Sequence, residues 1–210
     1  LEFRRVLFRS VCPGIGVQLD LVPKCGTEDI IPCAGIETVD VGPGFLETGA
    51  QTMFKGGYDD ARMQILYSAE DLNAAGFFGG TIDKLGWFIN EKNSFGGYDN
   101  FRISLSCAGI EDLGTEFEAG TSTVYGPTTV STITGWNTFA LDQPYNWDGE
   151  SGLLVEICFD NPDGSFTADD KVYYTNTEYT SVLIDFNLTA TGCDLENPAP
   201  SDNRPNLRVS

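Results

Sequence analysis

Short runs of alternating apolar and polar residues constrain this chain more than any other feature. In the run 101–107 every second residue is apolar, and the residues between them are polar. Successive side chains of a strand point to opposite faces, so such a run predicts a half-buried strand. We expect further strands at 62–67, 81–89, 122–125, 128–134, 136–141, 153–159, 172–175, 182–188 and 206–209. Regular spacing of this kind predicts an all-β fold, an antiparallel β-sandwich of jelly-roll type.

The segment Gly135 to Gly164 contains two of these runs, joined by a turn region rich in proline, aspartate and glycine. We expect the two runs to pair as an antiparallel hairpin within the sandwich. Trp136 lies in the first run beside apolar neighbours, and we expect its ring in the core.

One short helix is expected near residues 69–75. Ser68 is a favourable N-cap residue, and Asp71 follows three positions later as in a capping box. Gly76 suits the left-handed position that ends a helix. At about two turns the helix is too short to be stable alone, so Leu72 must hold it against the sandwich.

The composition excludes several classes of function. The chain has 210 residues, a net charge of −19 and no histidine. A surface this acidic repels nucleic acids and anionic lipids, and no apolar run approaches the ~20 residues of a membrane span. Without histidine the usual general base is missing, and no catalytic motif is evident among 31 acids, so we expect no enzyme.

The chain divides into three parts. Residues 1–10 are basic and match the translation of a common sequencing-library adapter, so we expect them to be an artefact. We then expect the natural chain to continue upstream. Residues 11–44 form a lead-in rich in cysteine and proline, and residues 45–210 form the sandwich domain.

The lead-in contains an alternating run that resembles a strand. We expect it to be a cysteine-stapled entry to the domain or, alternatively, a strand donated to a sheet edge of a neighbouring copy. The residues that would carry this strand donation are Val17, Leu19 and Leu21.

Six cysteines indicate disulfides and an oxidising compartment. They are well separated, and no C-x-x-C pair occurs, which argues against zinc and thioredoxin-like sites. Six cysteines allow 15 connectivities, so the sequence alone leaves the pairing open. They are Cys12, Cys25, Cys33, Cys107, Cys158 and Cys193.

Three segments carry a family resemblance: YDDARMQILYSAEDLNAAG, GWNTFALDQPYNWDGESGLLVEICFDN and the terminal NRPNLRVS. In this order they resemble a β-sandwich module of secreted, cell-surface proteins of Bacteroidota-type bacteria, commonly exported by the type IX system. The resemblance implies a disulfide between Cys158 and Cys193, after which Cys107 would pair with one of the lead-in cysteines. The resemblance assigns no catalytic residue to this chain.

Two ligand sites are candidates. Asp160, Asp163, Asp169 and Asp170 gather oxygen ligands of the kind that Ca²⁺ prefers, although Asp-Gly and Asn-Pro pairs also simply make turns. Calcium is therefore the one cofactor considered.

For glycans, the candidate contacts are Tyr145 and Trp147, since Trp147 stands in a predicted turn. The alternative is that Trp147 packs in the interior and Asp148 makes an Asx-turn.

These observations favour a non-catalytic extracellular or cell-surface module with a structural or adhesive role, and a subunit of a surface fibre is one form that this role can take. Its partners would be other copies of itself or neighbouring surface-protein domains, with no nucleic acid and no membrane insertion. The alternative is a carbohydrate-binding accessory module of a secreted hydrolase or peptidase.

Overall fold

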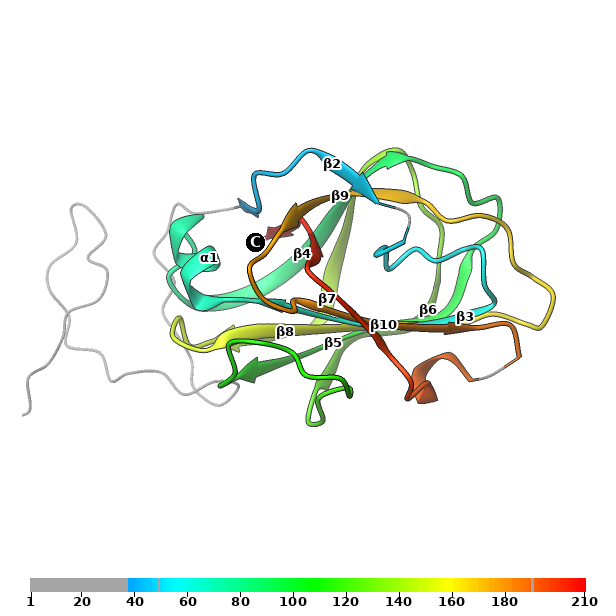
Figure 1. Cartoon of the computed structure of the whole chain (residues 1–210). Coiled ribbons are helices and arrows are strands. Elements are labelled where there is room, and N and C mark those ends of the chain that lie inside the picture. Colours follow the sequence, from blue (N-terminus) through cyan, green and yellow to red (C-terminus); the bar gives the residue numbers. More distant parts are fainter. Residues whose placement is uncertain (1–37, 49, 190) are drawn as a thin grey trace, which may run out of the picture.

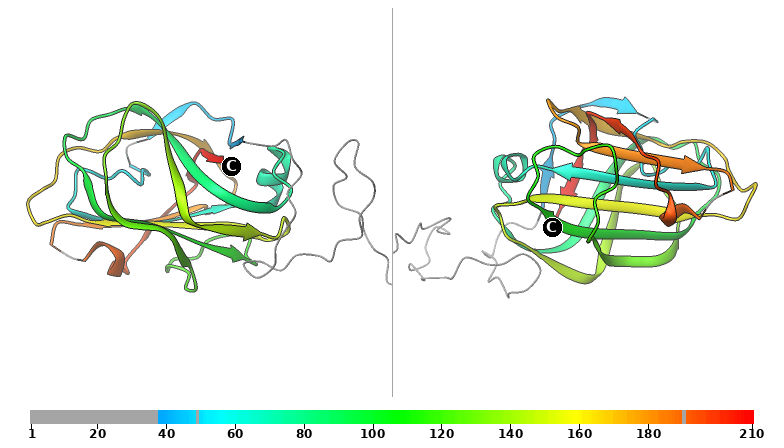
Figure 2. Two further views of the ribbon diagram at one scale, coloured as in Figure 1. Left: turned by 180° about the vertical axis from the view of Figure 1, so that it is seen from behind. Right: turned by 60° about the horizontal axis from the view of Figure 1, so that its bottom comes forward.

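The computed structural model describes residues 38–210, apart from 49 and 190. These residues form two antiparallel sheets packed face to face (Figure 1, Figure 2), which confirms the predicted β-sandwich. Sheet A contains β1 (Val39–Val41), β2 (Leu46–Thr48), β4 (Gly80–Glu91), β7 (Gly135–Trp147), β9 (Lys171–Asn176), β12 (Asn203–Pro205) and β13 (Leu207–Val209). Sheet B contains β3 (Asp60–Tyr67), β5 (Tyr98–Ala108), β6 (Ser122–Val130), β8 (Gly152–Asp160), β10 (Val182–Asn187) and β11 (Ala199–Ser201).

The core lies between the sheets and is rich in aromatic rings. Trp87 of β4, Phe101 of β5 and Phe159 of β8 are all completely buried. Strands β7 to β10 alternate between the sheets, as in a jelly roll. Because both sheets contribute every second side chain to one core, the register of each strand decides which residues remain on its outer face.

The predicted hairpin of the segment 135–164 is wrong. Strand β7 pairs with β4 in sheet A, whereas β8 pairs with β3 and β5 in sheet B. The connection between the two sheets is a tight turn in which Asp148 accepts hydrogen bonds from the amides of Glu150 and Ser151, both at 2.9 Å. Trp147 ends β7 inside the core and its indole N–H donates to the carbonyl of Ser151 at 2.9 Å.

Other element boundaries also differ from the prediction. The run expected at 122–125 and the first three residues of the run expected at 128–134 form one strand, β6, which continues past Gly126 and Pro127 with irregular register against β5 and ends at Val130. Strands β1, β2, β11 and β12 were not predicted, because three residues are too few to establish an alternating pattern.

The predicted helix is confirmed as α1 (Ala69–Ala74). The Ser68 hydroxyl accepts a hydrogen bond from the amide of Asp71 at 3.1 Å, and Gly76 has a φ of +99°. Leu72 is completely buried, so one side chain fastens the helix to the sandwich as expected. Among residues 38–210, with the two gaps, no helix has the length and apolar character needed to cross a bilayer.

A buried arginine joins the C-terminal strands to this helix. Arg204 of β12 is 1% exposed, forms an ion pair with Asp71, donates to the Tyr179 hydroxyl at 2.8 Å and lies over the Tyr67 ring. Burial raises the pKa of Asp71, but hydrogen bonds from Arg204 and Ser68 outweigh burial, and the net pKa is lowered. The RPN segment therefore has a structural role.

Two disulfides involve the described sheets. Cys158 of β8 is bonded to Cys193 in the 3-10 turn η1 (Gly192–Asp194), with a Cα–Cα distance of 5.2 Å, as the resemblance implied. Cys107 of β5 is also disulfide-bonded, and its partner lies outside the described residues. The first bond closes a segment of 35 residues.

Replacing Arg204 with methionine is expected to cost about 3 kcal/mol in the free energy of unfolding at neutral pH, because the partly buried Asp71 carboxylate loses its cation. Urea unfolding measures this loss. Since the folded-state pKa of Asp71 is lowered, its contribution is present above the unfolded value of 3.8 and disappears as pH falls through the folded value. The difference between parent and variant should therefore shrink below about pH 4. A difference that stays constant down to acid pH would contradict the ion pair as its source.

Replacing Cys158 and Cys193 together with serine is expected to lower the free energy of unfolding by about 3 to 4 kcal/mol, since the open chain regains the entropy of a loop of this length. Guanidinium unfolding of the oxidised parent and the double variant measures the change. The reduced parent should have a lower free energy of unfolding than the double variant, because reduction also opens the disulfide of Cys107. A loss below about 1 kcal/mol would contradict the expectation.

Candidate functional site

The outer face of sheet A carries a continuous row of aromatic rings. Neighbouring residues of β4 point to opposite faces, so Trp87 enters the core while Phe88 points outward. Phe88 lies opposite Trp136 of β7, with ring centroids 5.5 Å apart in an edge-to-face arrangement. On its other side Phe88 stacks on Tyr173 of β9 at 5.2 Å, and Phe45 meets Tyr173 edge-on at 5.7 Å. We call these four residues the aromatic row.

The aromatic row is held in place but remains open to solvent. Phe88, Trp136 and Tyr173 are each partly buried, mainly by packing on one another, and Phe45 is 81% exposed. Leu46, next to Phe45, is also largely exposed. Rings that contact each other in this way offer large contact area at low conformational cost.

Charged groups around the row are neutralised in pairs. Arg208 of β13 lies over the Trp136 ring at 3.6 Å and donates to both carboxylate oxygens of Asp40, at 2.6 and 2.7 Å. That hydrogen bond raises the pKa of Arg208. At the opposite side Lys171 and Glu91 form an ion pair at 2.6 Å, and its hydrogen bond lowers the pKa of Glu91. The two cations next to the row, Arg208 and Lys171, are therefore each in an ion pair, and Lys84 is exposed farther along β4 on the same face.

Gly86 makes this arrangement fit. It stands in β4 between Arg208 and Thr138 in the register, on the same face as Phe88. A Cβ atom there would lie 3.1 Å from the carbonyl oxygen of Asn137 and 3.1 Å from the Thr138 hydroxyl. Because Gly86 has no side chain, Arg208 can reach across β4 to Trp136, and Gly86 itself is buried.

The outer face of sheet B is different, because the protein covers it with its own chain. Leu66, Leu154 and Leu183 point outward there and are buried beneath Leu113 of the segment 109–121. The Gln64 amide donates to the carbonyl of Glu118 at 2.8 Å, and Arg62 lies over the Phe117 ring at 4.3 Å. Of the two outer faces, the one with the aromatic row is the face that the described residues leave open.

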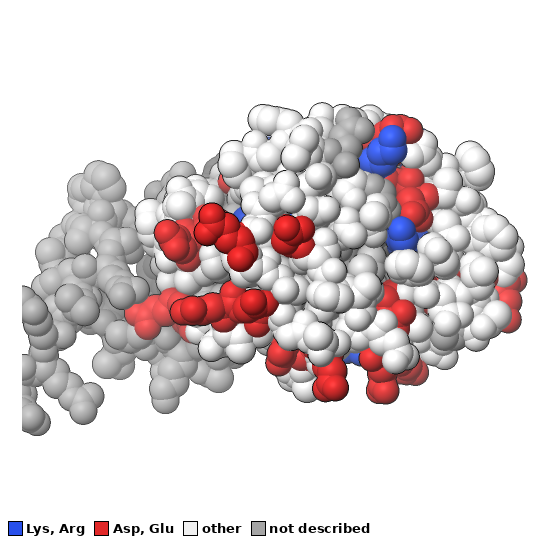
Figure 3. Space-filling model, viewed as in Figure 1, with Lys and Arg blue, Asp and Glu red and all other residues white. Residues whose placement is uncertain are grey.

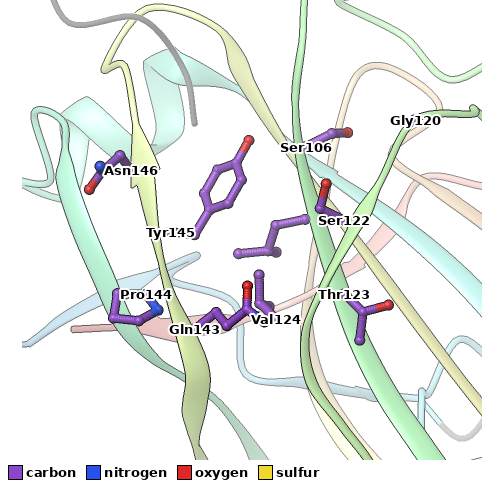
Figure 4. Close-up of a pocket in the computed structure, with 10 residues that line it drawn as sticks. Ser106, Gly120, Ser122, Thr123, Val124, Gln143, Pro144, Tyr145 and Asn146 are labelled. Atoms are coloured by element: carbon purple, nitrogen blue, oxygen red, sulfur yellow. The ribbon is translucent and has the colours of Figure 1, made fainter. Parts of the chain in front are cut away.

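A separate cleft lies between β7 and the strands β5 and β6 (Figure 4). Its volume is about 360 Å³, and the Tyr145 ring enters it from β7, facing Ser106 and Ser122 on the other wall. The Tyr145 hydroxyl donates to the Cys107 sulfur at 3.6 Å, and burial raises the pKa of this tyrosine. Tyr145 is thus accessible from a hydroxyl-lined cleft, but its ring is half-buried against the core.

Trp147, the other proposed glycan contact, is not accessible. Its side chain is completely buried and stacks on Phe77 at 5.4 Å. The expectation that Trp136 belongs to the core is wrong for the opposite reason. Asn137 and Phe139 are the buried residues of this run, so Trp136 faces outward. The alternation was visible in the sequence, but not which of its faces met the core.

The four aspartates proposed for calcium lie in different environments. Asp160 is in β8 opposite Asp60, and Asp163 is exposed in the following loop. The Asp169 carboxylate forms an ion pair with Lys55 at 2.6 Å and accepts from the amide of Gly57. Within the described part of the chain, no group of three or more acidic, cysteine or histidine side chains is arranged to hold a metal ion.

Asp170 instead fastens three loops together. Its carboxylate is completely buried and accepts from the amides of Asn93 and Ser94 at 2.7 and 2.8 Å, and from the Thr132 hydroxyl at 2.7 Å. Burial, followed by the charge of Asp170, raises the pKa of Tyr98, whose hydroxyl also contacts it. Each of these loops carries an exposed apolar side chain. We call these three residues, Phe95, Ile133 and Phe166, the loop tip.

The remaining candidates belong to residues 11–37 of the lead-in, which lie outside the described residues, and they stay predictions. They are the proposed donor-strand residues Val17, Leu19 and Leu21 and the cysteines Cys12, Cys25 and Cys33.

Comparison of the chain with protein-family models, with curated proteins and with solved structures gives no match.

Replacing Asp170 with asparagine is expected to cost about 2 kcal/mol in the free energy of unfolding, because an amide cannot accept all of these hydrogen bonds and leaves buried donors unsatisfied. Urea unfolding measures the loss, and hydrogen exchange should speed up at the amides of Asn93 and Ser94. Asp163→Asn, in the same loop but exposed, is the matched control and should change neither quantity. Equal effects of the two variants would contradict the assigned role.

Proposed function

We propose that this chain is a non-catalytic module of an extracellular or cell-surface protein, with a structural and adhesive role. One observation carries the proposal: sheet A presents an open aromatic row, while the outer face of sheet B is sealed by the segment 109–121. A soluble domain gains no stability from leaving such rings exposed, and an exposed apolar patch of this kind typically marks an interaction site.

The remaining features support a durable scaffold. The disulfide between Cys158 and Cys193 and the disulfide-bonded Cys107 suit an oxidising compartment outside the cytoplasm. The buried ion pair of Arg204 and Asp71 ties the C-terminal strands to the helix. The buried carboxylate of Asp170 is likewise hydrogen-bonded within the fold, which agrees with a mechanical rather than a chemical task.

The acidic surface disfavours binding of anionic partners. Red side chains predominate over blue on the face shown in Figure 3. With a net charge of −19, contact with nucleic acid or with anionic lipid is unfavourable. Partners are expected to meet the aromatic row instead, as neighbouring domains of a surface protein or as glycans.

Beads coated with the oxidised chain test the adhesive role. They are exposed under flow to films of neutral polysaccharide, of protein and of alkyl chains, and the beads that remain are counted. Phe45→Ser combined with Tyr173→Ser removes half of the aromatic row and is expected to lower retention on at least one film by about tenfold, as loss of interface anchors does.

The matched control uses the loop tip. Phe95→Ser combined with Phe166→Ser also removes two exposed aromatic rings, from the loops that follow β4 and precede β9 and outside the aromatic row, and should leave retention unchanged. Equal losses for the two pairs would show non-specific hydrophobic sticking, and no loss for the first pair would show that the aromatic row is not the adhesive surface. Either result would overturn the proposal.

A further inference from the structure

We infer that the cleft between β6 and β7 is a docking site for the lead-in of the same chain, and that the run 16–21 lies in it as an added strand. The cleft is separate from the aromatic row, so this assignment does not depend on the adhesive role. Three observations carry it: two sheet edges that face each other, a disulfide beside the cleft, and a lining that suits an alternating strand.

Strands β6 and β7 are edge strands of opposite sheets. Within the described part of the chain β6 pairs with β5 and β7 with β4, and neither has a second strand on its other side. The two edges are tied where the amide of Gly126 donates to the Asp142 carboxylate at 2.8 Å. Beyond this tie, Ser122 of β6 and Gln143 of β7 are exposed on opposite walls of the cleft (Figure 4). Exposed edges readily accept another strand, and native proteins therefore cover them.

A disulfide brings the lead-in to this cleft. Cys158 and Cys193 are bonded to each other, so the partner of Cys107 is one of the three lead-in cysteines. Cys107 packs against the core between the sheets, and its sulfur accepts from the Tyr145 hydroxyl at 3.6 Å. A disulfide requires the Cα atoms of its two cysteines to lie about 4.4 to 6.8 Å apart. One lead-in cysteine must therefore lie close to the Tyr145 wall.

The alternating run has the length that the cleft requires. Val17, Leu19 and Leu21 alternate with polar residues, so an extended run presents three apolar side chains to one side. From Val17 to Leu21 such a strand spans about 13 Å, and the β7 wall at residues 143–146 spans about 10 Å. The run can therefore follow the whole wall.

Two cysteines flank this run closely. Cys12 stands five positions before Val17, and Cys25 stands four positions after Leu21. An extended chain advances at most about 3.6 Å per residue, so either cysteine would keep the run within about 18 Å of Cys107. Cys33 is farther along the chain, with Pro32 beside it. The partner of Cys107 is therefore expected to be Cys12 or Cys25.

The lining of the cleft matches such a strand. Leu105 and Val124 are buried at its base, and the Tyr145 ring enters from β7. Side chains with hydroxyl or amide groups, such as Ser122 and Asn146, form the rest of the lining, and none of the lining residues is charged. The apolar side of the run can pack on this base, while its polar side faces water.

The covalent tether favours the chain's own lead-in over that of a second copy. The structure contains a single chain, and the disulfide of Cys107 is made within it. A tethered segment meets its site at an effective concentration on the order of millimolar. A second copy would have to approach against its own net charge of −19. Docking of the chain's own run would cover both edges and prevent edge-to-edge association.

Disulfide mapping of the oxidised full chain is the first test. Trypsin cleaves after Lys24 and a glutamate-specific protease after Glu28, so the three lead-in cysteines fall on separate peptides. Digestion without reduction and mass spectrometry should link Cys107 to Cys12 or Cys25, in material that runs as a monomer on a non-reducing gel. A link to Cys33 would overturn the inference. A link found only in a covalent dimer would overturn it too, and would identify a second copy as the donor.

Hydrogen exchange tests whether the run covers the edges. Val17→Asn with Leu19→Asn removes the apolar side of the run and leaves every cysteine in place. Exchange at the amides of residues 122–124 and 145–146 should speed up by about tenfold or more, because opening this edge then costs less free energy. The matched control, Gln18→Asn with Asp20→Asn, changes the opposite side of the same run and should leave these rates unchanged.

The two pairs also define the results that contradict the docking site. Unchanged exchange in the Val17 and Leu19 pair would show that the run does not lie in the cleft. Equal acceleration by both pairs would show that no particular side of the run faces the cleft. Thermal unfolding of each variant confirms that the sandwich is folded, since its core residues are untouched.

Discussion

The two-residue period of the strands is the constraint on which the rest of this structure depends. Each strand of the sandwich buries one set of alternate side chains, so of two adjacent aromatic residues one lies in the core and the other on the outer face. Trp87 is completely buried in the core, and Phe88, one position later, stacks on Tyr173 at the outer surface. The same rule buries Phe139 and leaves Trp136 outside. The aromatic row is thus a consequence of register, since Phe88 and Trp136 become neighbours only when β4 and β7 pair as they do.

Buried polar groups then hold the strands and loops in position. Arg204 connects the C-terminal strands to the short helix through Asp71, and Asp170 connects three loops at the other end of the strands. Each is almost or completely buried, and a buried charge is tolerated only when hydrogen bonds replace its water. This is why Asp170 is a structural residue rather than a free metal ligand. An acidic loop in the sequence and a calcium site differ in where the carboxylates point, and Asp170 is directed inward.

The two outer faces illustrate how a sandwich can be closed on one side and open on the other. On sheet B a long loop buries Leu66, Leu154 and Leu183, and a second small apolar cluster results. On sheet A the corresponding surface is filled by rings that pack sideways on one another, with Arg208 over one end. Stacked neighbours reduce the water-exposed area of each ring without hiding the row. This partial exposure of the rings is the physical basis for the proposed adhesive role.

Local patterns in the sequence determined the β class, most strand positions, the helix with its Ser68 cap and Gly76 end, and the expected burial of Leu72, because alternation, capping and left-handed glycine act over a few residues. The bond between Cys158 and Cys193 followed from resemblance and not from local physics. Only the tertiary structure decided that β7 and β8 belong to different sheets, that Trp147 is buried and that Trp136 is outside. The aromatic row joins residues from position 45 to position 173, and no local pattern encodes which distant strands will lie side by side. Pairing between distant strands and the packing of two sheets settle that, since a period of two marks both faces of a strand alike and leaves the choice of the inner face to its neighbours.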